Sequence, residues 1–245
     1  MRYRTILSAT FMSLFLVVGV IHADEGMWPM YLLNRLAFDQ LKARGLELSA
    51  EQIYNPKGGG IADAVVGLGA TGSFLSSEGL IVTNHHVAYT AIQEQSTPEH
   101  NYLRDGFYAS TKGEELQAHG YTANISLGIE DVTTRVLGAV SDKMTALQRY
   151  QAIDKVTKQI IRETEKTGEV RCKVVSMFGG KEYMKYTSLE LRDVRIVYIP
   201  PEAIGNYGGE TDNWIWPRHT GDFSFLRAYV GPDGKPADYS KDNVP

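Results

Sequence analysis

The segment formed by residues 71–93, TGSFLSSEGLIVTNHHVAYTAIQ, limits the possible folds more than any other part of the chain. Two β-rich runs, 72–75 and 80–83, flank the sequence SSEG, whose glycine suits a tight reversal. The segment therefore predicts two β-strands joined by a tight turn, followed by a histidine pair and a short helix. This pattern favours a mainly β fold over an alternating parallel one.

His86, at the end of the second strand, is a candidate general base. A base must reach its nucleophile by hydrogen bonding, and a strand end holds a side chain rigidly. Alternatively, His86 is an exposed loop residue, or a core residue whose hydrogen bonds are all made internally. Its position after two strands joined by a turn makes these alternatives less attractive. His85 is expected to be a packing or supporting residue. Adjacent strand residues point to opposite faces and no His-Glu-x-x-His pattern occurs, so no metal site is predicted.

Asp222 is the candidate partner of this base. It follows Gly221 and opens the apolar run 223–226, which predicts a strand with a carboxylate at its start. Such a carboxylate can accept the Nδ1 proton of a histidine, fix its tautomer and stabilise the imidazolium. Taken alone, an aspartate after glycine is a turn residue, but the order of histidine and then aspartate favours the pair. Asp212 is the second candidate, although no apolar strand follows it directly.

Hydrophobic periodicity predicts further elements along the chain. One amphipathic helix, ended by Gly45, is expected over 30–43, and a second, capped by Ser49, is expected to follow it. A long helix is expected to begin at Ser141 or Asp142 and to end at 164. Strands are expected over 61–69, 72–83, 125–137, 170–178, 183–191 and 194–199. Together these elements predict a β-barrel with flanking and inserted helices.

Two blocks of this sequence, 78–86 (EGLIVTNHH) and 212–225 (DNWIWPRHTGDFSF), resemble the N-terminal part of the S46 dipeptidyl peptidases. The resemblance extends over nearly all of residues 24–245. It implies the N-terminal barrel of a chymotrypsin-like double β-barrel peptidase, a serine-type exopeptidase that releases dipeptides from peptide N-termini. It further implies His86 as base, Asp222 as its orienter, and Asn213 and Trp214 as ligands of the free α-amine. Val87 departs from the family, in which many members have cysteine there.

The sequence contains neither Gly-x-Ser-x-Gly nor Gly-Asp-Ser-Gly. The resemblance places the nucleophilic serine in a second barrel outside this chain, so we interpret the 245 residues as a truncated N-terminal part. A base without a nucleophile performs no acyl transfer, and the segment alone is expected to be inactive. Two alternatives stay open, an HtrA-like trypsin-fold endopeptidase and a catalytically inactive peptide-binding barrel.

Residues 1–23 have a basic start, an apolar centre and a small residue before Asp24, as in a cleaved signal peptide. Export to the periplasm or cell surface of a bacterium is therefore expected. The formal charge of −4 and the lack of a basic run argue against nucleic-acid binding. A single cysteine, Cys172, excludes an internal disulfide, and it is expected to be either a small packed side chain or the partner of a cysteine outside this segment. We expect no cofactor, peptide substrates with a free N-terminus, and a homodimer for the full-length enzyme.

Overall fold

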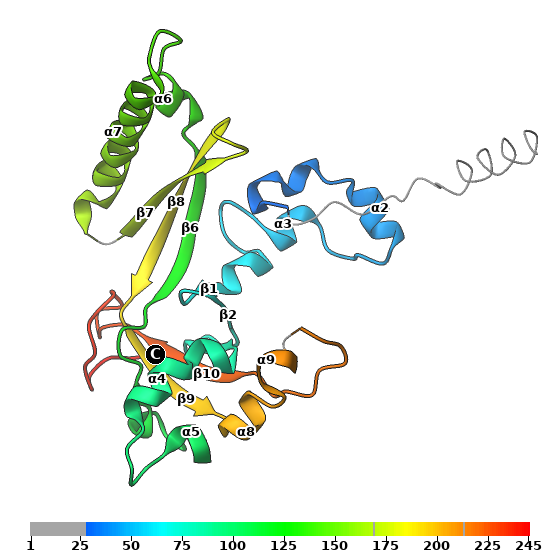
Figure 1. The fold of residues 1–245 in the computed structure, drawn as a ribbon, viewed down its shortest axis with the longest axis vertical. Helices are drawn as coiled ribbons and strands as arrows, with labels where there is room; N and C mark the ends of the chain where they lie inside the picture. Colours follow the sequence, from blue (N-terminus) through cyan, green and yellow to red (C-terminus); the bar gives the residue numbers. More distant parts are fainter. Residues whose placement is uncertain (1–27, 169, 213) are drawn as a thin grey trace, which may run out of the picture. The chain divides into compact units, whose positions relative to one another are not determined.

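The computed structural model describes residues 28–168, 170–212 and 214–245 (Figure 1). The chain divides into two compact units, Met1–Ala37 and Phe38–Pro245. In the first unit, the 3₁₀-helix η1 spans Met30–Arg35. The second unit holds the sheet and the remaining helices.

The predicted helix over 30–43 is wrong, because the backbone is extended at Leu36 (φ −70°, ψ 148°). Helix α2 begins afterwards and spans Phe38–Ala43. It ends as predicted at Gly45, which adopts φ 101°, and the Leu46 amide then donates to the Leu41 carbonyl at 3.0 Å. Apolar periodicity fits both sides of the break, so the pattern could not reveal it.

Helix α3 (Ala50–Ile53) confirms the predicted cap. Ser49 accepts from the Gln52 amide, and the Gln52 side chain accepts from the Ser49 amide. The segment 61–64, expected in a strand, is instead the 3₁₀-helix η2 (Ile61–Ala64).

The described residues form a 10-stranded sheet with the order β4-β9-β10-β3-β2-β1-β6-β8-β7, and β5 also pairs with β9. Every pairing is antiparallel, as the mainly β prediction required. The strands are β1 (Val65–Gly67), β2 (Thr71–Phe74), β3 (Leu80–Thr83), β4 (Phe107–Tyr108), β5 (Leu116–Gln117), β6 (Ala123–Asp131), β7 (Val170–Met177), β8 (Glu182–Leu191), β9 (Asp193–Ile199) and β10 (Ser224–Tyr229). Predictions for β7, β8 and β9 agree with these bounds to within a residue.

The turn between β2 and β3 depends on Gly79, which adopts φ 68°. A Cβ there would overlap the carbonyl oxygen of Ala228, and the Ala228 amide donates to the Gly79 carbonyl at 3.0 Å. Glycine therefore serves both the reversal and the close approach of β10.

The strand predicted over 125–137 ends early, because β6 stops at Asp131 and helix α6 (Thr133–Leu137) follows. The Asp131 carboxylate accepts from the Thr133 amide at 2.8 Å and turns the chain into the helix. The long helix α7 (Ala146–Thr164) begins later than predicted. Thr145, not Ser141 or Asp142, caps it in a reciprocal pair with Gln148.

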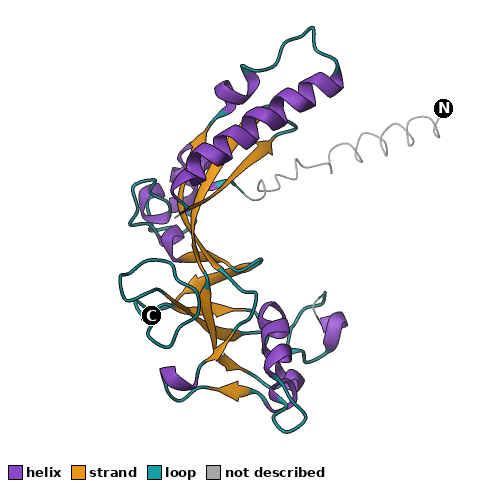
Figure 2. Cartoon of the chain, turned by 90° about the vertical axis from the view of Figure 1, so that its left-hand side faces the viewer, coloured by secondary structure: helices purple, strands orange, loops and turns teal. Residues whose placement is uncertain are grey.

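Two apolar clusters stabilise this unit. In the larger, helix α4 (His85–Gln95) packs Ala88, Ala91 and Ile92 against Ile81, Ile196, Leu226 and other buried sheet residues. Each large side chain buried there contributes roughly 1.5–3 kcal/mol. In the smaller cluster, Val132, Val136, Ile160 and Tyr183 join α6 and α7 to the outer parts of β6, β8 and β7. Helix α7 runs along these strands (Figures 1 and 2). We call α6, α7 and the outer parts of β6, β7 and β8 together the arm.

The remaining helices are short and lie in the connections: α5 (Tyr102–Asp105), η3 (Lys112–Glu114), η4 (Glu165–Thr167), α8 (Glu202–Gly205) and α9 (Gly209–Asp212). Within the described part of the chain, none of the helices has the length and apolar character needed to cross a membrane.

Candidate active site

His86 is the second residue of α4, and Asn84 separates this helix from β3. The sequence placed His86 at a strand end, whereas the structure has it on the first helical turn, three residues beyond the last residue of β3. The same helix buries His85, Ala88, Ala91 and Ile92. The His86 side chain faces outward and is 65 % exposed, so its ring is accessible to a reacting group.

Asp222 lies two residues before β10, and β10 pairs with β3 through Ser224 and Thr83. This pairing brings together residues that are 136 apart in the sequence. His86 Nδ1 lies 2.7 Å from Asp222 Oδ2, and the His86 amide donates to Oδ1 at 3.0 Å. The structure thus brings the two predicted residues into direct contact.

Asn84 completes the support of this carboxylate, and sequence reasoning missed it. Its side-chain amide donates to the Asp222 carbonyl at 3.1 Å and to Oδ2 at 3.2 Å. Asp222 therefore accepts from one ring, one backbone amide and one side-chain amide, while its side chain is only 20 % exposed. Its place between Thr83 and the histidines was the available signal, because a polar residue between a strand and the helix that carries the base can contact the partner of the base.

The arrangement fixes what the imidazole can do. With the Nδ1 proton directed at Asp222, the exposed Nε2 atom carries the lone pair and can accept a proton from a third group. The carboxylate would then stabilise the positive charge that forms on the ring. A base–orienter pair of this geometry suits proton transfer to and from a nucleophile.

A cavity of about 180 Å³ adjoins the pair and is lined by His86, Gly205, Asn206, Gly209, Glu210, Thr220 and Asp222. Sites for small-molecule ligands usually enclose about 300–1,000 Å³, so this cavity holds only part of such a ligand. Glu210 places a carboxylate in its wall and accepts from Trp214 Nε1 at 2.9 Å. Gly205, Asn206, Glu210 and Thr220 were not predicted, because only tertiary packing of α8 and α9 brings them here.

The predicted amine-binding residues are described in part. Asn213 lies outside the described residues. Trp214 is 80 % exposed and donates a hydrogen bond to Glu210, so it is not a core aromatic. Asp212, the second candidate for the acid, ends α9, whereas Asp222 makes the contact with His86.

His85 is buried, with 1 % of its surface exposed, and its ring lies edge-on to Tyr89 with centroids 6.0 Å apart. Burial lowers the pKa of His85; the nearby carboxylates of Asp222 and Glu202 oppose this shift, and His86 reinforces it. The ring is therefore neutral at neutral pH and acts as a packing group.

Cys172 on β7 is also buried and has a free thiol, as the packed-side-chain interpretation expects. In the described ranges, no group of three or more His, Cys, Asp or Glu side chains could hold a metal ion.

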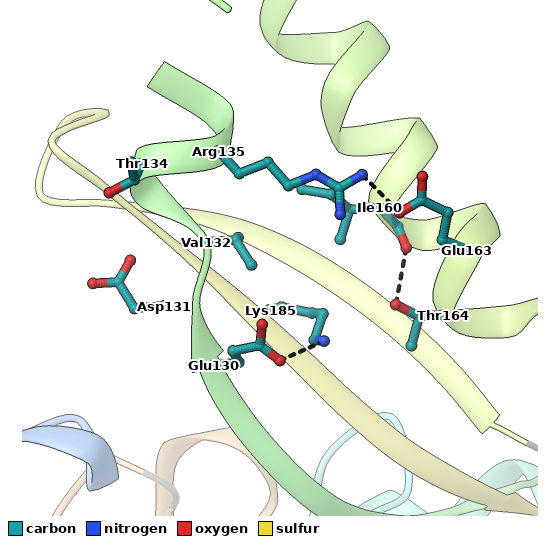
Figure 3. A pocket seen from close by; sticks show the side chains of 9 residues that line it. All are labelled: Glu130, Asp131, Val132, Thr134, Arg135, Ile160, Glu163, Thr164 and Lys185. Atoms are coloured by element: carbon teal, nitrogen blue, oxygen red, sulfur yellow. Dashed lines mark hydrogen bonds and ion pairs between the residues drawn. The ribbon is translucent and has the colours of Figure 1, made fainter. Parts of the chain in front are cut away.

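A larger cavity, about 490 Å³, lies in the arm between α6, α7 and the strands (Figure 3). Val132 and Ile160 contribute apolar side chains to it. Its basic groups pair with acidic ones, Lys185 with Glu130 and Arg135 with Glu163, each at 2.6 Å. This cavity contains no base–orienter pair. One of its ion pairs joins α6 to α7 and the other joins β6 to β8, and such partly exposed pairs contribute little to stability.

The sequence model of the family described as Peptidase S46 matches residues 23–245. Among curated relatives, the chain is 41 % identical over 236 residues to the dipeptidyl-peptidase 7 of Capnocytophaga gingivalis, covering 95 % of this chain and 33 % of that protein. It is 45 % identical over 235 residues to the Asp/Glu-specific dipeptidyl-peptidase of Shewanella putrefaciens, covering 95 % of this chain and 32 % of that protein. The chain therefore spans about a third of the length of these relatives.

Solved structures of Porphyromonas endodontalis DPP11 share the fold. The complex with the dipeptide Arg-Glu is 39 % identical with a TM-score of 0.81, and the complex with Arg-Asp is 40 % identical with a TM-score of 0.83. Each comparison covers 91 % of this chain and 33 % of the DPP11 chain. The similarity thus extends through the antiparallel sheet and its helices.

Proposed function

This chain belongs to the peptidase S46 family, and on that premise we propose that it is the N-terminal part of a serine-type dipeptidyl peptidase. His86 serves as the general base and Asp222 as its orienter, while the nucleophilic serine lies outside these 245 residues. The observation that carries the proposal is the 2.7 Å contact between His86 Nδ1 and Asp222 Oδ2. Relatives named Asp/Glu-specific and relatives named dipeptidyl-peptidase 7 match at similar identity, so the proposal stops at the release of dipeptides.

In this mechanism the serine hydroxyl transfers its proton to Nε2 of His86 as its oxygen attacks the carbonyl carbon of the second peptide bond. Asp222 stabilises the imidazolium. The C–N bond then breaks, the leaving amine takes the proton from Nε2, and a dipeptidyl ester remains on the serine. Water attacks this ester while His86 accepts one of its protons, the bond to the serine oxygen breaks, His86 returns the proton to that oxygen, and the dipeptide is released.

Selection for dipeptides requires recognition of the free α-amine two residues from the cleaved bond. We assign this to Asn213, whose side-chain carbonyl can accept from an ammonium group, and to Trp214, which offers a backbone carbonyl and an apolar wall. The Glu210 carboxylate, in the wall of the cavity beside His86, supports the assignment, because it adds a negative charge there.

The assignment is tested in the full-length protein with a dipeptidyl substrate and its N-acetylated form. The wild-type protein is expected to cleave the free-amine substrate and not the acetylated one. Equal cleavage would favour the HtrA-like endopeptidase, and binding without cleavage would favour the inactive barrel. Asn213→Ala is expected to lower kcat/KM for the free-amine substrate roughly ten- to a hundred-fold, which corresponds to the loss of about 1.5–3 kcal/mol for a hydrogen bond to a charged group.

For the location of the nucleophile, residues 24–245 alone are expected to show no peptidase activity above background. The sheet also presents a hollow of about 650 Å³ with Tyr108, Tyr198, Phe223 and Phe225 in its lining. Such apolar surface favours dye binding or association in the isolated segment. A monodisperse, active segment would refute the downstream serine.

Export is the last part of the proposal. The basic start and apolar centre of residues 1–23 support a signal peptide that directs the protein to the periplasm or cell surface. N-terminal sequencing of the exported protein should begin at Asp24. We also propose that the full-length protein is a homodimer. Light scattering after size-exclusion chromatography tests this oligomeric state.

A further inference from the structure

The end of α8 touches the neighbours of both members of the pair. On the aspartate side, the Ile204 carbonyl accepts from the Gly221 amide at 2.9 Å, and the Gly205 carbonyl accepts from the Thr220 hydroxyl at 3.1 Å. Asp222 follows these residues directly. The position of its backbone is thus tied to the last turn of α8.

On the histidine side, the contact is between Gly205 and the ring of His85. Gly205 is buried, and a Cβ placed on it would lie 2.8 Å from His85 Nδ1 and nearer still to Cγ and Cδ2. Its φ lies outside the left-handed region, so glycine is required here for space rather than for backbone conformation. His85 is bonded to His86, so this contact bears on the base.

A second glycine shows the same tight approach. A Cβ on Gly221 would lie 2.7 Å from Ile204 Cγ2. Both glycines therefore let α8 pack directly on the segments that carry the base and its orienter. Residues 205 and 206 also line the cavity beside the pair, so a shift of α8 would move the cavity wall as well.

The His85 ring is held by packing. Its Nε2 atom makes no hydrogen bond with the described residues, its ring contacts Tyr89 edge-on, and a Cβ added at Gly205 would collide with three of its ring atoms. A side chain positioned in this way transmits a displacement of its neighbour to its own backbone, because close-packed interiors cannot absorb an added methyl group without moving.

We propose that His85 and Gly205 are positioning residues: their ring-on-glycine contact sets the last turn of α8, and α8 in turn sets the distance between His86 and Asp222. The inference rests on the proposed peptidase function. It assigns to the first histidine of the pair a role in catalysis that acts through the second one.

The test uses the full-length protein and measures kcat and KM at a temperature well below the melting point of every variant. Gly205→Ala is expected to lower kcat about 100-fold, because a displacement of about 1 Å is enough for such a loss, with KM changed less than kcat. The matched control is Gly128→Ala on β6, where an added Cβ meets nothing within 4 Å. Its kcat should stay within two-fold of wild type.

The decisive measurement is a rescue. In the double variant Gly205→Ala/His85→Ala, the ring that collides with the new methyl group is gone, so kcat should recover at least five-fold relative to Gly205→Ala alone. His85→Ala by itself should lower kcat about ten-fold and keeps the test usable if Gly205→Ala does not fold. Wild-type kcat in either single variant, or no recovery in the double variant, would overturn the inference.

These outcomes are separable from a failure of the proposed function. If His86→Ala retains activity, the peptidase assignment itself is wrong. If His86→Ala is inactive while Gly205→Ala and His85→Ala match wild type, only the positioning role is lost.

Discussion

The arm and the β3–β10 junction use charged residues in opposite ways. The arm has the larger cavity, about 490 Å³, but its charges form two separate ion pairs, Arg135 with Glu163 and Lys185 with Glu130. The junction has a cavity of about 180 Å³, and there one carboxylate accepts from three different groups at the end of two paired strands. Convergence of polar groups, rather than cavity size, distinguishes the region suited to chemistry.

The comparison is tested most strongly at His86. In the full-length protein, His86→Ala should lower kcat by about 10⁴- to 10⁶-fold, as removal of a triad member does. Steady-state kinetics with a dipeptidyl substrate measures this loss. His100→Ala is the matched control, because His100 is exposed and its ring stacks on Tyr102, away from Asp222. If the His86→Ala protein had activity near wild type, the β3–β10 junction would be no more catalytic than the arm.

Asp222→Asn should reduce turnover by about 10⁴-fold, because an amide presents the wrong partner to the Nδ1 proton. The melting temperature should change little, since the amide keeps the shape of the carboxylate. Kinetics and thermal melting of the same preparation separate the two effects. If turnover and melting temperature fell together in proportion to unfolded protein, Asp222 would be only a structural residue.

A smaller effect is expected from His85 when the pH is lowered. Burial lowers its pKa in the folded protein below the ordinary value of 6.5, so the unfolded chain binds the proton more readily. Stability should therefore fall as the pH decreases below about 6.5, and His85→Asn should reduce that dependence. Melting temperatures at pH 7.5 and 5.5 report it, with His100→Asn as the exposed control. The facing groups Asp222, Glu202 and His86 are unchanged in both variants. A slope identical to wild type would mean that His85 does not titrate differently on folding.

The smallest effect is expected in the arm. Glu163→Gln removes the ion pair with Arg135. Both side chains of this pair are about half exposed, so the free energy of unfolding should fall by at most about 1 kcal/mol. Activity should be unchanged. Denaturant unfolding and kcat/KM provide the two readouts. A ten-fold loss of activity would show that the arm takes part in the reaction and would break the comparison.

The sequence predicted the elements whose signals are local. Alternation located β7, β8 and β9, and the Ser49 cap and the Gly45 stop were both found. The helix expected over 30–43 failed because apolar spacing continues across an extended residue. The cap of α7 was misplaced because Ser141, Asp142 and Thr145 are all good capping residues, and only the reciprocal bond with Gln148 distinguishes them.

For the site, the strand-ending histidine and the strand-opening aspartate were readable from the sequence, because each carries its own local pattern. Glu210, Gly205 and Asn84 were not readable. Their positions depend on how α8, α9 and β10 pack, and no periodicity or turn signal encodes a close approach between segments more than 100 residues apart.

The pairing of β3 with β10 has a consequence for how such a chain can diversify. The whole arm lies between these strands in the sequence. The contact between His86 and Asp222 nevertheless depends on the pairing of the strands themselves. Insertions in the outer arm would lengthen a loop whose closure entropy grows only with the logarithm of its length. Deletion of Phe223 would instead move Asp222 one position closer to β10 and turn its side chain to the opposite face. Changes of length are therefore expected to be tolerated in the outer arm and to disrupt the site when they fall between Asp222 and β10.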